Sequence, residues 1–239
     1  MKITLESLEE KESCRDGKAW FNSAFPDGGE YQSVIDQAVK DDRLDYVRWL
    51  LDNFGATDDV LEIDGDLISS VPVFFVGHIR VKGRISVDAY LFAGGGIKAG
   101  GGIKAGGGIK AGEGIKAGEG IKAGEGIEAG EGIKAGWGIK AGWGIEAGEG
   151  IEAGWGIKAG WGIKAGEGIE AGEGIEAVWG IEAGDDWGIY AGLRVRINKT
   201  AYRTVIASTE PRNLMCGVYK ERAKPRSEQA ARLTRCPIK

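Results

Sequence analysis

An aliphatic residue recurs at every sixth position through just over half of this chain. The spacing begins in a stretch with no other repetition, at Leu61, Leu67, Val73, Ile79, Ile85 and Leu91, and then runs unbroken from Ile97 to Ile181. The frame slips by two residues at Asp185-Asp186 and returns at Ile189. Slippage of a low-complexity glycine tract would not place aliphatic residues in register in its nonrepetitive flank, so the spacing predicts a solenoid.

A second, weaker period of eighteen residues appears four positions after each aliphatic residue. Every third hexad is acidic there, and the other two series contain glycine, glutamate and tryptophan; the acidic series is Glu113, Glu131, Glu149, Glu167 and Asp185. Eighteen residues per turn means three hexads per turn. We therefore predict a mainly β fold, a triangular β-helix with three hexapeptides per coil, a small N-terminal α-helical cap and a C-terminal β segment with a basic tail.

Each hexad, such as the one that begins at Ile115, has the composition of a short strand followed by a corner. In Ile-Lys-Ala, alternation points the isoleucine and alanine inward and the lysine outward. We expect Gly-x-Gly to form the corner with backbone angles that a Cβ disfavours. A buried isoleucine contributes roughly 1.5–3 kcal/mol, little more than the glycines cost, so stability must come from stacked coils.

The composition divides the chain into three parts. Residues 1–60 form a helical cap, in which the apolar spacing over residues 14–54 predicts two amphipathic helices that end at Gly55. Residues 61–191 form the β-helix, and residues 192–239 form a second cap, with strands around Leu193–Ala207, and a basic tail. The first part has 14 acidic against 7 basic residues, and the last has 12 basic against 3 acidic.

The sequence indicates a reduced, cytoplasmic protein. The N-terminus lacks a secretory signal, and no stretch approaches the roughly 20 apolar residues needed to span a bilayer. The three cysteines, Cys14, Cys216 and Cys236, are an odd number and form no CxxC pair, which argues against a disulfide framework or a zinc site.

Few residues are candidates for catalysis or metal binding. His78 is the only histidine, so a three-histidine zinc site is excluded, and an outward, solvated role is favoured over a catalytic one. Asp64 and Asp66 flank Gly65 in a weak calcium-type cluster, but aspartate is far commoner simply as a turn residue. We expect no cofactor and no metal ion.

The strongest candidate for a binding surface is a set of tryptophans at corner positions. Exposure of five large aromatic side chains is unusual for a monomer, and tryptophan is enriched among interface hot spots. One interpretation is a partner-binding face or a self-association seam; the other is that stacked rings simply stiffen the corners. The residues are Trp137, Trp143, Trp155, Trp161 and Trp179.

Charged residues offer two further surfaces. The outward position of the hexads changes from lysine to glutamate along the coil axis, which serves either a partner or only solubility. The basic tail from Lys220 to Lys239 could bind an acidic protein surface or nucleic acid.

Two family resemblances bear on function. Six-residue aliphatic periodicity resembles the hexapeptide-repeat acyltransferases, although the small residue here follows the aliphatic one instead of preceding it. The segment Cys14-Arg-Asp-Gly-Lys-Ala-Trp-Phe, followed by Trp49-Leu-Leu-Asp and the GIKAGx repeats, looks like a family of uncharacterised phage and prophage proteins. That resemblance implies an origin in a mobile element, and proteins of this kind include inhibitors of host defence such as anti-CRISPR proteins.

Three functions remain open on the sequence alone. The first is a non-enzymatic binding protein that engages a host protein or complex through the tryptophan and charged faces. The second is an acyltransferase of the hexapeptide-repeat type with His78 as the base, and the third is a structural or assembly module that forms homo-oligomers. The absence of assembled catalytic groups favours the first.

Overall fold

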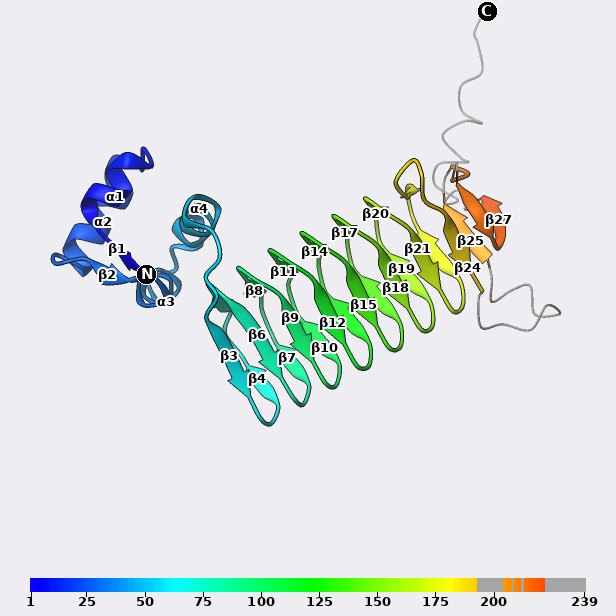
Figure 1. The fold of residues 1–239 in the computed structure, drawn as a ribbon, viewed down its shortest axis with the longest axis horizontal. Coiled ribbons are helices and arrows are strands. Elements are labelled where there is room, and N and C mark those ends of the chain that lie inside the picture. Colours follow the sequence, from blue (N-terminus) through cyan, green and yellow to red (C-terminus); the bar gives the residue numbers. More distant parts are fainter. Residues whose placement is uncertain (193–203, 208, 212, 222–239) are drawn as a thin grey trace, which may run out of the picture.

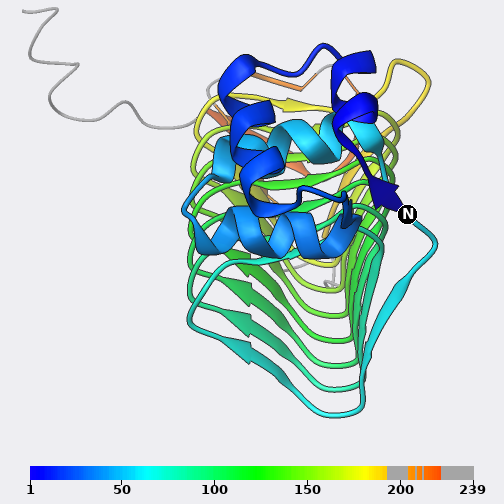
Figure 2. The same cartoon turned by 90° about the vertical axis from the view of Figure 1, so that its left-hand side faces the viewer.

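The computed structural model describes residues 1–192, 204–207, 209–211 and 213–221, and within them it confirms the β-solenoid (Figure 1). The N-terminal part contains the short strands β1 (Lys2–Ile3) and β2 (Gly29–Glu30) and the helices α1 (Leu5–Glu10), α2 (Arg15–Ala24), α3 (Tyr31–Lys40) and α4 (Leu44–Phe54). The strands that follow wind into a three-sided prism, whose three sides appear in Figure 2.

Each side of the prism is one parallel sheet. The first face consists of β3 (Val60–Ile63), β6 (His78–Val81), β9 (Ile97–Ala99), β12 (Ile115–Ala117), β15 (Ile133–Ala135), β18 (Ile151–Ala153), β21 (Ile169–Ala171), β24 (Ile189–Ala191) and β26 (Leu214–Cys216). The second face consists of β4 (Leu67–Ser69), β7 (Ile85–Val87), β10 (Ile103–Ala105), β13 (Ile121–Ala123), β16 (Ile139–Ala141), β19 (Ile157–Ala159), β22 (Ile175–Ala177), β25 (Thr204–Ala207) and β27 (Val218–Glu221). The third face consists of β5 (Val73–Phe75), β8 (Leu91–Ala93), β11 (Ile109–Ala111), β14 (Ile127–Ala129), β17 (Ile145–Ala147), β20 (Ile163–Ala165) and β23 (Ile181–Glu182).

The predicted period of eighteen is the strand register. Ile115 pairs with Ile97 on one side and with Ile133 on the other, and the flanking Lys116 and Ala117 pair in the same way. The isoleucine and alanine are buried and the lysine between them is exposed. The core is therefore a set of aliphatic ladders that run along the coil axis.

The corner glycines are required for a reason other than the expected backbone angle. From Gly65 to Gly188, none of the corner glycines has a φ in the left-handed region, whereas Gly192, after β24, has a φ of 80°. A Cβ on Gly124 would instead lie 1.8 Å from the carbonyl oxygen of Gly106 in the preceding coil. Close approach of two backbones, coil against coil, excludes a side chain at this position.

The helical part contains four helices instead of the two that the sequence predicted. The two expected helices are α3 and α4, and α4 ends as predicted at Gly55, whose φ of 72° suits glycine. Helices α1 and α2 are additional, with Thr4 and Cys14 as their N-caps. Tyr31 is buried in this part, and its hydroxyl lies 3.0 Å from the carbonyl oxygen of Leu50.

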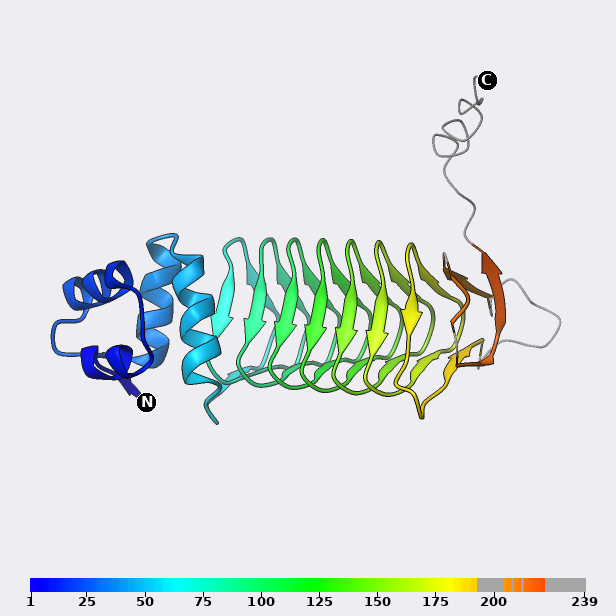
Figure 3. The ribbon, with the colours of Figure 1, turned by 90° about the horizontal axis from the view of Figure 1, so that it is seen from above.

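Gln32 of α3 joins the helices to the solenoid. Its amide nitrogen donates to the carbonyl oxygen of Phe74 at 2.9 Å, and its amide oxygen accepts from the backbone N–H of Val76 at 3.0 Å. Phe74, Val76 and Phe92 also belong to the apolar core of the helices. The helices lie at one end of the prism (Figure 3), but the inward residues of the first coil remain only partly buried: Leu61, Ile63, Leu67, Val73 and Phe75.

At the opposite end, the described residues continue two of the sheets. In β25, Val205 pairs with Ile175 of β22 and is fully buried, and β27 pairs with β25 in turn. Of the strands expected around Leu193–Ala207, only residues 204–207 are described. The basic tail beyond Glu221 and Cys236 lie outside the described residues, while Cys14 and Cys216 are free thiols. No helix in the described part is long and apolar enough to cross a membrane.

Candidate interaction surfaces

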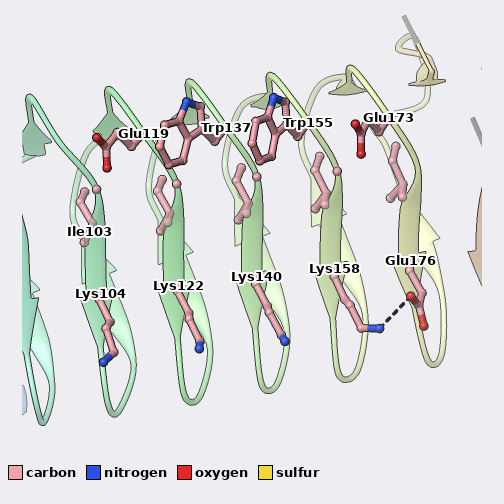
Figure 4. A pocket seen from close by; sticks show the side chains of 18 of the residues that line it. Ile103, Lys104, Glu119, Lys122, Trp137, Lys140, Trp155, Lys158, Glu173 and Glu176 are labelled. Atoms are coloured by element: carbon pink, nitrogen blue, oxygen red, sulfur yellow. Dashed lines mark hydrogen bonds and ion pairs between the residues drawn. The ribbon is translucent and has the colours of Figure 1, made fainter. Parts of the chain in front are cut away.

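The residue two positions before each repeat strand occupies a corner of the prism beside the face that follows. On the corner before the second face, the rings of Trp137 and Trp155 stack with centroids 5.4 Å apart and planes 7° apart (Figure 4). On the corner before the third face, Trp143 and Trp161 stack at 5.6 Å and 10°. These four side chains are 47–58% exposed, so stacking leaves about half of each indole in solvent.

Trp179 does not extend the second of these stacks. It is 71% exposed, and within the described residues no aromatic ring contacts it. The cause is Val178, which replaces the corner glycine: at the equivalent Gly160, a Cβ would lie 1.8 Å from the carbonyl oxygen of Gly142. The backbone shifts, and both Val178 and Trp179 donate to the carbonyl oxygen of Trp161, at 2.8 and 3.0 Å.

Trp187 is a corner tryptophan that the sequence analysis missed. Ile189 pairs with Ile169, so Trp187 stands two residues before a first-face strand and is 49% exposed. The two-residue insertion at Asp185-Asp186 places it one coil after Glu167, at the corner that the sequence assigned to acidic residues. We predicted acidic residues throughout this corner series. That prediction was wrong at the position after Glu167, which Trp187 occupies. The aliphatic spacing around Ile189 was the signal that could have revealed it.

A shallow groove runs along each face of the prism, and the three grooves differ in charge. The first-face groove, of about 710 Å³, is lined by four lysine or arginine side chains and seven acidic ones. The third-face groove, of about 840 Å³, has three basic against four acidic side chains. The second-face groove, of about 970 Å³, has five basic against three acidic side chains and includes Trp137 and Trp155.

Ion pairs connect successive coils where lysine and glutamate meet in the outward rows. Lys110 pairs with Glu128 at 3.0 Å between the Nζ and Oε1 atoms on the third face, and Lys134 pairs with Glu152 on the first. On the second face the row is Lys104, Lys122, Lys140, Lys158 and Glu176. Lys158 and Glu176 pair at 2.9 Å.

His78 is partly buried beside the first-face groove. Its Nδ1 atom accepts a hydrogen bond from the backbone N–H of Gly96 at 3.0 Å and lies 3.6 Å from a carboxylate oxygen of Glu113. The imidazole therefore links its own coil to the coils of Gly96 and Glu113, and this structural role explains why it is partly buried. We predicted an outward, solvated histidine, but the side chain is only 22% exposed and accepts a hydrogen bond from the backbone.

The aspartates of the weak calcium-type cluster pair with basic side chains one coil further along. Asp64 pairs with Lys82 at 2.7 Å and Asp66 with Arg84 at 3.1 Å. Among the described residues, no group of three or more histidine, cysteine or acidic side chains is arranged to hold a metal ion.

Comparison with known proteins matches only the N-terminal part. Residues 1–55 match the family model described as the YdhT N-terminal domain, which spans α1 to α4 and ends at Gly55. No curated protein and no solved structure matches the chain.

Proposed function

We propose that this chain is a non-enzymatic binding protein that contacts a partner protein through the tryptophan corners of its solenoid. The observation that carries the proposal is the pair of half-exposed stacks, Trp137 on Trp155 and Trp143 on Trp161. Burial of an indole against a partner is a large source of binding energy, and large exposed aromatic patches are rare on monomers. Stacking fixes the rings in advance, which lowers the entropy lost on binding.

The fold does not need tryptophan at these corners. Glu125 occupies the corner position one coil before Trp143, and its carboxylate accepts a hydrogen bond from the hydroxyl of Tyr90 at 2.8 Å. Glu119 and Glu173 flank the other stack in the same corner row (Figure 4). Because the same corner positions accept glutamate in other coils, the fold alone does not account for the tryptophans.

The partner that we propose is a protein or protein complex of a bacterial host. The resemblance of the chain to phage and prophage proteins supports a bacterial host protein or complex, with inhibition of host defence, of the anti-CRISPR type, as the consequence of binding. The match of residues 1–55 to the YdhT N-terminal domain carries no activity with it.

The alternatives have less support. An acyltransferase would use His78 as its base, but its Nδ1 already accepts a backbone N–H, so the neutral ring carries its proton on Nε2 and has no free lone pair to accept a proton from a substrate. A structural or assembly module would bury the same tryptophans against a second copy, so the oligomeric state measured by light scattering separates it from a binding protein.

Capture from a bacterial lysate tests the proposal. The wild-type chain should retain a protein that Trp143→Glu/Trp161→Glu, Trp137→Glu/Trp155→Glu, or both double variants together fail to retain. The matched control is Glu131→Gln/Glu149→Gln at the remaining corner, which should retain it. Equal recovery by all variants, or no recovery by a folded wild type, would contradict binding through the tryptophan corners.

A further inference from the structure

The groove along the second face differs in charge from the grooves along the two other faces. The whole chain has a formal charge of −5, yet this groove has five basic side chains against three acidic ones. In the two other grooves the acidic side chains outnumber those of lysine and arginine. We call it the lysine groove, defined by Lys104, Lys122, Lys140, Lys158, Trp137 and Trp155.

Three of its lysines lack an internal counter-charge. Lys158 pairs with Glu176, as the dashed line in Figure 4 shows. Within the part of the chain that the structure describes, no carboxylate lies within 4.0 Å of the ammonium groups of Lys104, Lys122 or Lys140. These three side chains stand directly above one another in the parallel register, one coil or about 4.8 Å apart.

Such a row is unfavourable for the isolated chain. Like charges directly opposite each other in neighbouring strands destabilise a sheet. The fold does not require lysine at every outward position, because the equivalent row on the third face contains both charges: Lys110, Glu128, Glu146, Lys164 and Glu182. An anionic partner would offset the repulsion, and the repulsion in the free chain would then favour binding.

The tryptophans beside the row favour protein over nucleic acid as that partner. Bases bind aromatic side chains by stacking on the ring faces, but Trp137 and Trp155 already cover one face of each other. Glu119 and Glu173, at the neighbouring positions of the same corner row, would repel any anion along the corner, and a nucleic acid carries a charge at every nucleotide, whereas a peptide can place its carboxylates at the lysines alone (Figure 4). An apolar side chain can pack on the exposed ring edges without inserting between the rings.

We propose that the lysine groove binds an acidic protein segment, whose carboxylates pair with Lys104, Lys122 and Lys140 while an adjacent apolar side chain packs on Trp137 and Trp155. The inference rests on the proposed function and specifies the chemistry of the partner at one of the two tryptophan corners.

Fluorescence anisotropy with defined probes tests this directly. The probes are a fluorescein-labelled oligoglutamate peptide, the same peptide with a central leucine, and an oligothymidylate of matched length, all at low ionic strength. The test variant is Lys104→Glu/Lys122→Glu/Lys140→Glu. Its control, Lys98→Glu/Lys116→Glu/Lys134→Glu, makes the same change of charge in the matching coils of the first face. Circular dichroism establishes that both variants are folded, which is expected because other hexads hold glutamate at this position.

The wild type should bind both peptides, and the second-face variant about tenfold more weakly, because each exposed charge contact contributes only a fraction of a kilocalorie per mole. The first-face control should stay within about twofold of the wild type on the same reasoning. The leucine should improve binding to the wild type but not to Trp137→Glu/Trp155→Glu.

Several results would overturn the inference. Tighter binding of oligothymidylate than of either peptide would make the groove a nucleic-acid surface. Equal weakening by both triple variants, or no peptide binding at all, would mean that the row has no selective affinity for carboxylates. Loss of self-association in the second-face variant, without peptide binding, would identify a second copy as the occupant. In each of these cases capture through Trp143 and Trp161 could still succeed, so the proposed function would stand or fall separately.

Discussion

The indole of Trp143 lies parallel to that of Trp161 one coil further along, with ring centroids 5.6 Å apart. Such a stack contributes about 0.5–1.5 kcal/mol beyond its buried area. Trp143→Glu/Trp161→Glu should therefore lower the free energy of unfolding by no more than a few kcal/mol and leave a cooperative transition. Glutamate already occupies successive coils at another corner, at Glu113, Glu131, Glu149 and Glu167. Chemical denaturation measures the effect, and loss of cooperative folding would show that the stack is structural.

The aliphatic ladders should tolerate no charge. Ile133 is 1% exposed, and Ile133→Asp would bury a carboxylate without a partner, at a cost of several kcal/mol. Lys134→Asp, one residue away, faces solvent and should cost about 1 kcal/mol or less, mainly through the lost pair with Glu152. Thermal unfolding followed by circular dichroism compares them. Similar melting curves would mean that these hexads are not packed as described.

Much of this architecture could be predicted from the sequence because its cause is local. The spacing from Leu61 onward defines the register, and the Ile-Lys-Ala alternation predicts which side chains are buried. Trp187 was missed because the insertion at Asp185-Asp186 changes the phase. Helices α1 and α2 were missed because their short apolar patterns are completed only by packing against α3 and α4.

The role of the corner glycines could not be predicted for a different reason. Their constraint is the distance to a carbonyl oxygen in another coil, eighteen residues away, as at Gly124 and Gly106. The same contact explains why Val178 isolates Trp179, although the spacing alone predicts a stack. A glycine pattern in the sequence does not distinguish a constraint on φ from a close approach of two backbones.

Restoring the corner glycine should restore the third ring of the stack. Val178→Gly removes the Cβ that conflicts with the preceding coil, so Trp179 should stack on Trp161 and become less exposed. The measurements are the exciton signal of coupled indoles in circular dichroism and quenching of tryptophan fluorescence by acrylamide. Val178→Ala is the matched control, since its Cβ meets the same obstacle. An equal response of the alanine variant would refute the steric explanation.

The helical part should lose stability in alkaline solution. Burial, and secondarily the carboxylate of Asp52, raise the pKa of Tyr31 above its ordinary value of about 10. The protonated hydroxyl is therefore favoured by folding, so its contribution is complete below pH about 10 and is lost as the pH rises further. Urea denaturation of the wild type should show this loss. Tyr31→Phe should be about 1 kcal/mol less stable at neutral pH, with a weaker alkaline dependence.

A second tyrosine provides the control for that experiment. The hydrogen bond to Glu125 raises the pKa of Tyr90, but this side chain lies at the surface of the third-face groove. Tyr90→Phe should keep most of the alkaline dependence of the wild type. An unchanged pH profile in Tyr31→Phe would show that Tyr31 is not the group responsible.

The affinity of the captured partner for corner variants tests most directly whether the tryptophan corners are the binding surface. With the partner purified, calorimetric titration gives its dissociation constant for the wild type and for each double variant. A hot-spot tryptophan contributes about 2 kcal/mol or more, so Trp143→Glu/Trp161→Glu or Trp137→Glu/Trp155→Glu should weaken binding by about thirtyfold or more. Glu131→Gln/Glu149→Gln should bind like the wild type. If both tryptophan variants are folded and retain wild-type affinity, the corners are not the binding surface.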